Sequence, residues 1–310
     1  MLMQAPVLVI GRQGQVASAL QRLASAQLPQ RPLLALGRPQ LDLVQPDFED
    51  QFRRALGHHQ PALVINAAAY TAVDRAEVEV DQAMAINAAA VAAMGRGCAE
   101  RAIPLLHLST DYVFDGTGIT PWVPDAATRP LGVYGASKLQ GEQALQQLGM
   151  HHLILRVSWV FGQHGANFVR TMLRLAAERD ELRVVDDQMG GPTSAEAIAS
   201  ALLQLVEPSI ANCSPLTPEA AFFPWGVHHL QGRPLVTWYG FAQEIVSRAV
   251  ALGLLQRAPA LVPITTDAFP TPAQRPANSR LDCRSSIEQL GLVLPSWRED
   301  LDQWLQELAR

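Results

Sequence analysis

The sequence predicts an α/β protein built on a doubly wound parallel sheet, with a smaller, mainly C-terminal α/β domain. Short apolar runs alternate with longer amphipathic segments over the first half of the chain, the pattern of parallel strands connected by helices. The first apolar run, 7–10, leads through a glycine-containing turn into an amphipathic segment over 20–28. Because a strand, a glycine turn and a helix in this order begin dinucleotide-binding folds, we expect a Rossmann-like domain at the start of the chain.

The same periodicities predict the remaining elements in order. Further strands of the sheet are expected over 33–36, 62–66, 104–109 and 152–157, with helices near 47–56, 75–102 and 134–148. Beyond Trp159 the alternation loosens, and we expect a helix over 167–179, a strand over 182–185, a helix over 194–206 and a Pro-rich surface loop over 208–224. The block 228–310 should add further helices that cover the carboxyl edge of the sheet as a substrate lid.

The chain is long enough for two domains. It has 310 residues, of which 48% are hydrophobic and 17% charged, so it can bury a large core. We expect a dinucleotide-binding domain over 1–160, with 193–225 packing back on it. The substrate domain is then expected over 161–192 and 226–310.

Charge and cysteine content narrow the class of protein. The net charge of -5 and the absence of a basic stripe argue against nucleic acid as a partner. No apolar run approaches the length of a membrane span, and the first strand begins too early to leave room for a signal peptide. The odd, scattered cysteines Cys98, Cys213 and Cys283 fit a reducing compartment. We therefore expect a cytoplasmic protein.

The turn after the first strand is the candidate phosphate-binding loop. Gly11 permits a tight turn, Gly14 lets the backbone approach a pyrophosphate, and the small Ala17 stands where a third glycine would allow close helix–strand packing. The whole loop is expected to bind cofactor: Gly11, Arg12, Gln13, Gly14, Gln15 and Val16. The alternative is a strand–turn–helix unit that binds no ligand.

The residues after the second strand bear on which cofactor is used. Enzymes that use NAD commonly end this strand with an acidic residue for the ribose 2′-hydroxyl, whereas here Leu36 is followed by Gly37 and Arg38. Arg12 lies within the glycine loop, and two arginines suit a 2′-phosphate. The sequence therefore favours NADPH, with NADH as a second donor.

A single lysine provides the main catalytic candidate. The remaining residues among the 24 lysines and arginines are all arginine, and Lys138 follows Tyr134 by one helical turn. A tyrosine hydroxyl is a weak acid at neutral pH until a nearby cation stabilises its phenolate. The compact ammonium can do this and can also donate to the ribose hydroxyls of a nicotinamide nucleotide. The alternative is a surface Tyr–Lys pair without a catalytic role.

Together these residues resemble the extended short-chain dehydrogenase/reductases. The matching segments are the glycine loop, the Tyr134–Lys138 pair and the run 108–114. Four further segments, 64–74, 156–162, 187–193 and 275–282, resemble one family among them, the dTDP-4-dehydrorhamnose reductases. The resemblance extends from the first strand to the last helix.

The resemblance implies both a reaction and the residues that catalyse it. It implies transfer of hydride from NADPH to C4 of dTDP-4-dehydro-6-deoxy-L-mannose (dTDP-4-dehydro-β-L-rhamnose), which gives dTDP-L-rhamnose in the last step of dTDP-rhamnose biosynthesis. Thr110 would hydrogen-bond the substrate carbonyl and Tyr134 would donate the proton. Lys138 would lower the pKa of Tyr134 and bind the nicotinamide ribose.

The resemblance also implies binding residues around this triad. For the cofactor these are Asp42 and Leu43 at the adenine edge, with Ala67, Ala68, Ala69 and Tyr70 packing along the nucleotide. For the substrate they are Thr71, Val73, Thr110, Asp111 and Trp159, with Arg275 and Arg280 reaching the diphosphate. The small residues can equally serve close packing, the tryptophan can be core, and arginine is the default cation of this chain.

Several alternatives stay open at this point. The chain could be a non-catalytic NADP-binding regulatory subunit of the same superfamily, or a reductase or epimerase of another nucleotide sugar. The adjacent histidines at 58–59, 151–152 and 228–229 are expected at strand or turn edges, and no metal-ligand spacing stands out. The family is associated with magnesium, for which the sequence assigns no ligands. A homodimer is neither required nor excluded.

Overall fold

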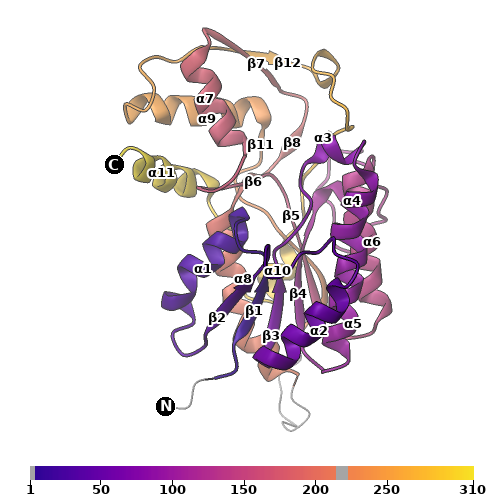
Figure 1. The fold of residues 1–310 in the computed structure, drawn as a ribbon. Coiled ribbons are helices and arrows are strands. Elements are labelled where there is room, and N and C mark those ends of the chain that lie inside the picture. Colours follow the sequence, from indigo (N-terminus) through magenta and orange to yellow (C-terminus); the bar gives the residue numbers. More distant parts are fainter. Residues whose placement is uncertain (1–3, 214–222) are drawn as a thin grey trace.

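A six-stranded, fully parallel sheet forms the centre of the molecule in the computed structural model, which describes residues 4–213 and 223–310. Its strand order is β10-β5-β4-β3-β1-β2 (Figure 1). The strands are β1 (Val7–Ile10), β2 (Leu33–Leu36), β3 (Leu63–Asn66), β4 (Leu105–Thr110), β5 (His152–Val157) and β10 (Gly226–Leu230). The strands expected from the apolar runs are confirmed to within a residue at their ends.

Helices cover both faces of this sheet because its strands are apolar on both sides. In β1, Val7 and Val9 face one apolar cluster while Leu8 and Ile10 face another. The first cluster includes α1 (Gln15–Gln27) and α8 (Ala195–Ala211), and the second includes α2 (Phe48–His59), α5 (Ala90–Ala99) and α6 (Val133–Gln147). This confirms the doubly wound architecture (Figure 1).

A third apolar cluster lies beyond the carboxyl ends of the strands. Its aromatic centre is formed by Phe161, Phe241 and Trp297, which contact one another in edge-to-face pairs. The elements of this region are α7 (Phe168–Glu178), α9 (Trp238–Ala251) and α11 (Trp297–Leu308), with β7 (Glu181–Val185) paired in parallel to β12 (Ala260–Ile264). The short pairs β6 (Val160–Phe161) with β9 (Thr193–Ser194) and β8 (Met189–Gly190) with β11 (Val236–Thr237) join it to the main sheet. The helix α10 (Arg284–Glu288) packs against β10.

The helix predicted over 75–102 is wrong as a single element. The chain instead forms α3 (Val73–Ala76), α4 (Val80–Met84), a π-helical turn (Ala85–Ala89) and then α5. Asn87, which is buried in the π-helical turn, accepts from the Tyr70 amide and donates to the Tyr70 carbonyl. At this point α6 lies so close that a Cβ on Gly141 would be 2.2 Å from the Asn87 carbonyl oxygen. The π-helical turn therefore accommodates both the hydrogen bonds of the Asn87 side chain and the close approach of α6.

Two further predictions need correction. Residues 226–310 were assigned to the substrate domain, but β10 pairs in register with β5 as the edge strand of the main sheet. The polar pair His228–His229 hid this strand, although both side chains are buried. The loop predicted from 208 begins later, because α8 continues to Ala211 and the Asn212 side chain donates to the Pro208 carbonyl. Residues 214–222 of that predicted loop lie outside the described residues.

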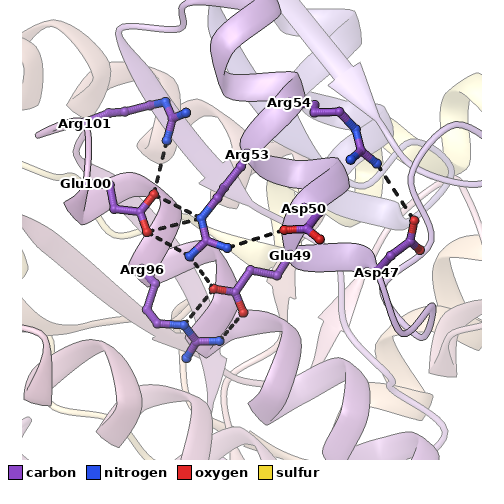
Figure 2. A network of polar contacts seen from close by, with 8 residues as sticks. All are labelled: Asp47, Glu49, Asp50, Arg53, Arg54, Arg96, Glu100 and Arg101. Carbon is purple, nitrogen blue, oxygen red and sulfur yellow. Dashed lines mark hydrogen bonds and ion pairs between the residues drawn. The ribbon is translucent and has the colours of Figure 1, made fainter.

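The surface between α2 and α5 carries a network of ion pairs (Figure 2). Arg53 contacts Glu49 at 2.6 Å and Glu100 at 2.8 Å, and Arg96 contacts Glu49 at 2.5 Å. Such exposed pairs typically contribute about 0–1 kcal/mol each.

No helix within 4–213 or 223–310 has the length and apolar character needed to cross a membrane.

Candidate active site

A cavity of about 870 Å³ opens at the carboxyl end of the main sheet, where ligands of doubly wound folds bind. Its size is within the usual range for sites that hold small organic ligands. It brings together most of the predicted site residues, namely Gly11, Arg12, Gln13, Gly14, Gln15, Val16, Arg38, Asp42, Leu43, Ala67, Ala68, Ala69, Tyr70, Thr71, Val73, Thr110, Asp111, Tyr134, Lys138 and Trp159.

The glycine loop forms one end of this cleft. Gly11 has a φ of 117°, which disfavours any residue with a Cβ, and a Cβ there would also lie 3.3 Å from the Ala67 backbone. Gly14 is the N-cap of α1 and leaves the first amides of that helix without a side-chain cap. Helix amides that point into a cleft bind anionic groups well. The loop thus has the conformation that phosphate binding needs.

Two arginines stand beside the loop. Arg12 and Arg38 are exposed and both line the cleft, and Arg12 Nη1 donates to Gln40 Oε1 at 2.7 Å. No acidic residue follows β2 before Arg38. This wall therefore presents positive charge where the adenosine ribose of a dinucleotide would lie.

The catalytic candidates converge on the same cleft from two elements. Thr110 is the last residue of β4, while Tyr134 and Lys138 lie on the first turns of α6. Burial raises the pKa of Tyr134 to about 12, and the nearby Thr110 hydroxyl acts in the opposite direction. Burial lowers the pKa of Lys138 to about 8, against the attraction of Glu142.

Around Tyr134, the group that lowers the pKa of the phenol is the Thr110 hydroxyl, and the role expected for Lys138 stays a prediction. Lys138 Nζ donates to the Leu108 carbonyl at 2.7 Å and lies 3.4 Å from His107 Nε2. Its contacts therefore tie the lysine to β4 rather than to the phenol.

Asp111 lies beside the triad in an unusual environment. The carboxyl group is buried, its Oδ1 accepts from the Thr110 hydroxyl at 3.1 Å, and its Oδ2 has no hydrogen-bond partner among the described residues. Burial raises the pKa of Asp111 to about 6, while the nearby hydroxyls of Ser279 and Thr110 partly offset this. An under-satisfied carboxyl group in a cleft is a ready acceptor for ligand hydroxyls.

Trp159 forms the opposite wall of the cleft. Its ring stacks on Trp238 of α9 with centroids 3.6 Å apart, and its backbone has a φ of 47°. A Cβ on Gly190 would lie 2.6 Å from the Trp159 ring. Trp159 is thus held in place by α9, and its ring lines the cleft instead of being part of an apolar core.

Arg275 and Arg280 do not line the cleft, in contrast to the sequence prediction. Arg275 forms a two-bond ion pair with Asp74, at 2.8 and 3.0 Å, and Arg280 Nε donates to Asn278 Oδ1 at 2.8 Å. Both Nη groups of Arg275 and the Nε of Arg280 are therefore engaged by the protein itself. Asp74 follows the cleft residue Val73, so the Arg275 pair fastens the 273–275 segment to the rim.

Several residues around the triad were not predicted from the sequence. Tyr112 packs edge-to-face on Tyr134 with ring centroids 5.5 Å apart, and Glu79 accepts from the Tyr70 hydroxyl at 2.6 Å. Asn66 and His107 lie buried behind Lys138. The only signal for the latter two was a polar residue inside or at the end of an apolar strand. Among the described residues, no group of three or more His, Cys, Asp or Glu side chains could hold a metal ion.

Comparisons with known proteins agree on one family. Residues 3–310 match the family model described as the RmlD substrate binding domain. The dTDP-4-dehydrorhamnose reductase of Escherichia coli K12 is 39% identical over 308 residues, and the match covers 97% of each chain. The enzyme of that name from Sinorhizobium fredii is 40% identical and covers 94% of this chain and 93% of its own. The crystal structure of a dTDP-4-dehydrorhamnose reductase from Bacillus anthracis in complex with NADP has a TM-score of 0.86 and 30% identity, and covers 98% of this chain and 100% of its own.

Proposed function

The chain belongs to the dTDP-4-dehydrorhamnose reductase family, and on that premise we propose how its cleft performs the family's reaction. The protein is an NADPH-dependent oxidoreductase that reduces the C4 keto group of dTDP-4-dehydro-β-L-rhamnose to give dTDP-L-rhamnose. The observation that carries the residue assignment is the convergence of Thr110, Tyr134 and Lys138 in one cleft with the glycine loop.

We propose that Tyr134 is the proton donor and that Thr110 holds the keto oxygen. NADPH, when bound, supplies the hydride. Thr110 and Tyr134 line the same part of the cleft, so a carbonyl oxygen between the two hydroxyls would accept from both. The buried ammonium of Lys138 stabilises negative charge on this side of the cleft and donates to the nicotinamide ribose.

The nucleotide is held by the end of the cleft that carries the glycine loop. The α1 amides and the open backbone at Gly11 and Gly14 suit the pyrophosphate. Arg12 and Arg38 suit a 2′-phosphate, and Asp42 with Leu43 suits the adenine edge. The contacts along the nucleotide are assigned to Gln13, Gln15, Val16, Ala67, Ala68, Ala69 and Tyr70.

The sugar is placed between the triad and the tryptophan wall. Trp159 offers an apolar face to the deoxysugar, while Asp111, Thr71 and Val73 line the same space. We assign the main sheet and its helices to nucleotide binding and the α7–α9–α11 region to the substrate side. The three cysteines are unpaired, which supports a cytoplasmic location.

The assay that tests the substrate uses purified protein with NADPH and the dTDP-4-keto-6-deoxysugar, with and without the 3,5-epimerase that supplies the L-configured ketone. The near-ultraviolet absorbance of NADPH should fall only when the epimerase is present. A fall without epimerase would point to another nucleotide sugar. Binding of NADPH without turnover in either arm would favour a regulatory subunit.

A further inference from the structure

Behind the catalytic lysine lies a buried polar chain that the proposed reaction does not use. His107 on β4 is fully buried, and its two ring nitrogens face different partners. Nδ1 lies 3.0 Å from Asn66 Nδ2, and Nε2 lies 3.4 Å from Lys138 Nζ. Asn66, at the end of β3, is buried as well.

The backbone fixes the orientation of the Asn66 amide. Asn66 Oδ1 accepts from the Ala68 backbone N–H at 3.1 Å. A backbone N–H cannot accept, so the opposite amide orientation would place two donors against each other. The side-chain NH₂ group of Asn66 must therefore face His107.

The amide in turn fixes the imidazole. Because Asn66 donates to His107 Nδ1, that nitrogen carries a lone pair and no proton. Burial and the nearby charge of Lys138 move the pKa of His107 well below its ordinary value, so the ring is neutral. A neutral ring with a bare Nδ1 carries its proton on Nε2, and this N–H points at Lys138 Nζ.

We propose that Asn66 and His107 are positioning residues that hold the imidazole in its Nε2–H tautomer and thereby make the ammonium of Lys138 easier to deprotonate, although it remains the main form at neutral pH. A donor that faces an ammonium repels it, whereas the same donor can bond to the lone pair of an amine. Leu108 O accepts from Nζ in either form. The inference rests on the proposed function only where it calls Lys138 part of the catalytic site.

The other groups that face the pair act differently. Glu142, one turn further along α6, attracts the ammonium and opposes the effect, and it is itself paired with Arg156 at 2.6 Å. His152 on β5 disfavours charge on His107. Tyr134 is neutral at working pH because burial raises its pKa. The Nε2–H group is thus the contact that can be altered without changing a charge at these positions.

Two substitutions distinguish the effect of the imidazole tautomer from the effect of losing a buried ring. Asn66→Ala removes the donor that faces Nδ1 and adds no charge, so the imidazole can carry its proton on Nδ1 and turn its Nε2 lone pair toward Lys138. His107→Asn keeps an acceptor for Asn66 and removes the N–H that faces the lysine. His229→Asn is the matched control, because it removes a buried imidazole from β10 of the same sheet.

The single lysine makes the readout direct, since protein labelled with ¹³Cε-lysine gives one resonance. We expect Lys138 to titrate near 8 in the parent and in His229→Asn, and about one to two pH units higher in both test variants. Nitrogen-15 spectra of the histidines should show an Nε2–H tautomer for the ring lost in His107→Asn. The alkaline fall of kcat should move in the same direction as the titration.

The proposal is overturned by a Lys138 titration that stays at the parent position in both folded variants, or by an Nδ1–H tautomer in the parent. These measurements need no substrate. A protein that failed to reduce the keto sugar but showed the shifted titration would contradict the proposed function and support this inference.

Discussion

The two ends of the cleft are built in different ways. At the cofactor end, the glycine turn before α1 and the one-turn spacing of Tyr134 and Lys138 on α6 are set by local backbone structure. At the substrate end, Trp159 depends on Trp238, and the rim depends on the Asp74–Arg275 pair, whose members are 201 positions apart. The residues at the cofactor end are therefore easier to predict from the sequence. The positions of the residues at the substrate end depend on contacts across the whole fold.

The strongest test lies where the two ends meet. Tyr134→Phe removes only the phenol oxygen, so kcat should fall by about two to four orders of magnitude while the Kd for NADPH changes little. Stopped-flow turnover and NADPH fluorescence titration measure the two quantities. Tyr239→Phe, which removes a phenol on α9 away from the cleft, is the control. A loss confined to KM would make Tyr134 a binding residue.

The cofactor end is tested by its positive charge. Arg38→Ala should reduce the preference for NADPH over NADH by about ten- to a hundredfold at low salt, because a charge-assisted bond to the 2′-phosphate is worth about 1.5–3 kcal/mol. The preference should also shrink as salt rises. Ratios of kcat/KM for the two donors measure it, and Arg54→Ala removes an exposed charge on α2 as the control. Equal kcat/KM values for NADPH and NADH in the parent enzyme would show that neither Arg12 nor Arg38 recognises the 2′-phosphate.

The substrate end is tested through the residue behind its wall. Trp238→Ala removes the stack that holds Trp159, so KM for the sugar nucleotide should rise roughly severalfold to tenfold, since aromatic pairs contribute about 0.5–1.5 kcal/mol beyond burial. The Kd for NADPH should stay unchanged. Trp304→Ala disturbs the same apolar cluster without touching Trp159, and it controls for loss of packing. Equal effects of both variants on KM would mean that the stack has no specific role.

The smallest effect concerns stability. The folded pKa of Asp111 is about 6, above the unfolded value of 3.8, so the carboxylate destabilises the fold above pH 6 and this cost disappears as the pH falls toward 4. Asp111→Asn should therefore raise the free energy of unfolding by about 1–3 kcal/mol at pH 7 and leave it nearly unchanged at pH 4. Thermal melts at both pH values measure this.

Asp267→Asn, at an exposed carboxylate, serves as the control for the melts. A gain from Asp111→Asn of the same size at both pH values would mean that packing, rather than ionisation, accounts for it.

The strand and helix pattern was predictable because it depends on side-chain periodicity within one segment. The elements that were not predicted contain polar residues within an apolar strand or depend on a contact with a residue distant in sequence. β10 was missed because His228 and His229 interrupt its apolar pattern, and the π-helical turn was missed because Asn87 bonds to Tyr70.

By itself, the sequence determined the Rossmann-like sheet, the family, the glycine loop and a catalytic pair spaced one helical turn apart. Local spacing is sufficient for these features, since the backbone of a strand, turn or helix sets where neighbouring side chains point. The tertiary structure decided that Arg275 pairs with Asp74, that Trp159 stacks on Trp238 and that His107 lies beside Lys138. Each of these depends on which donor meets which acceptor or ring across the fold, and no periodicity along the chain encodes that.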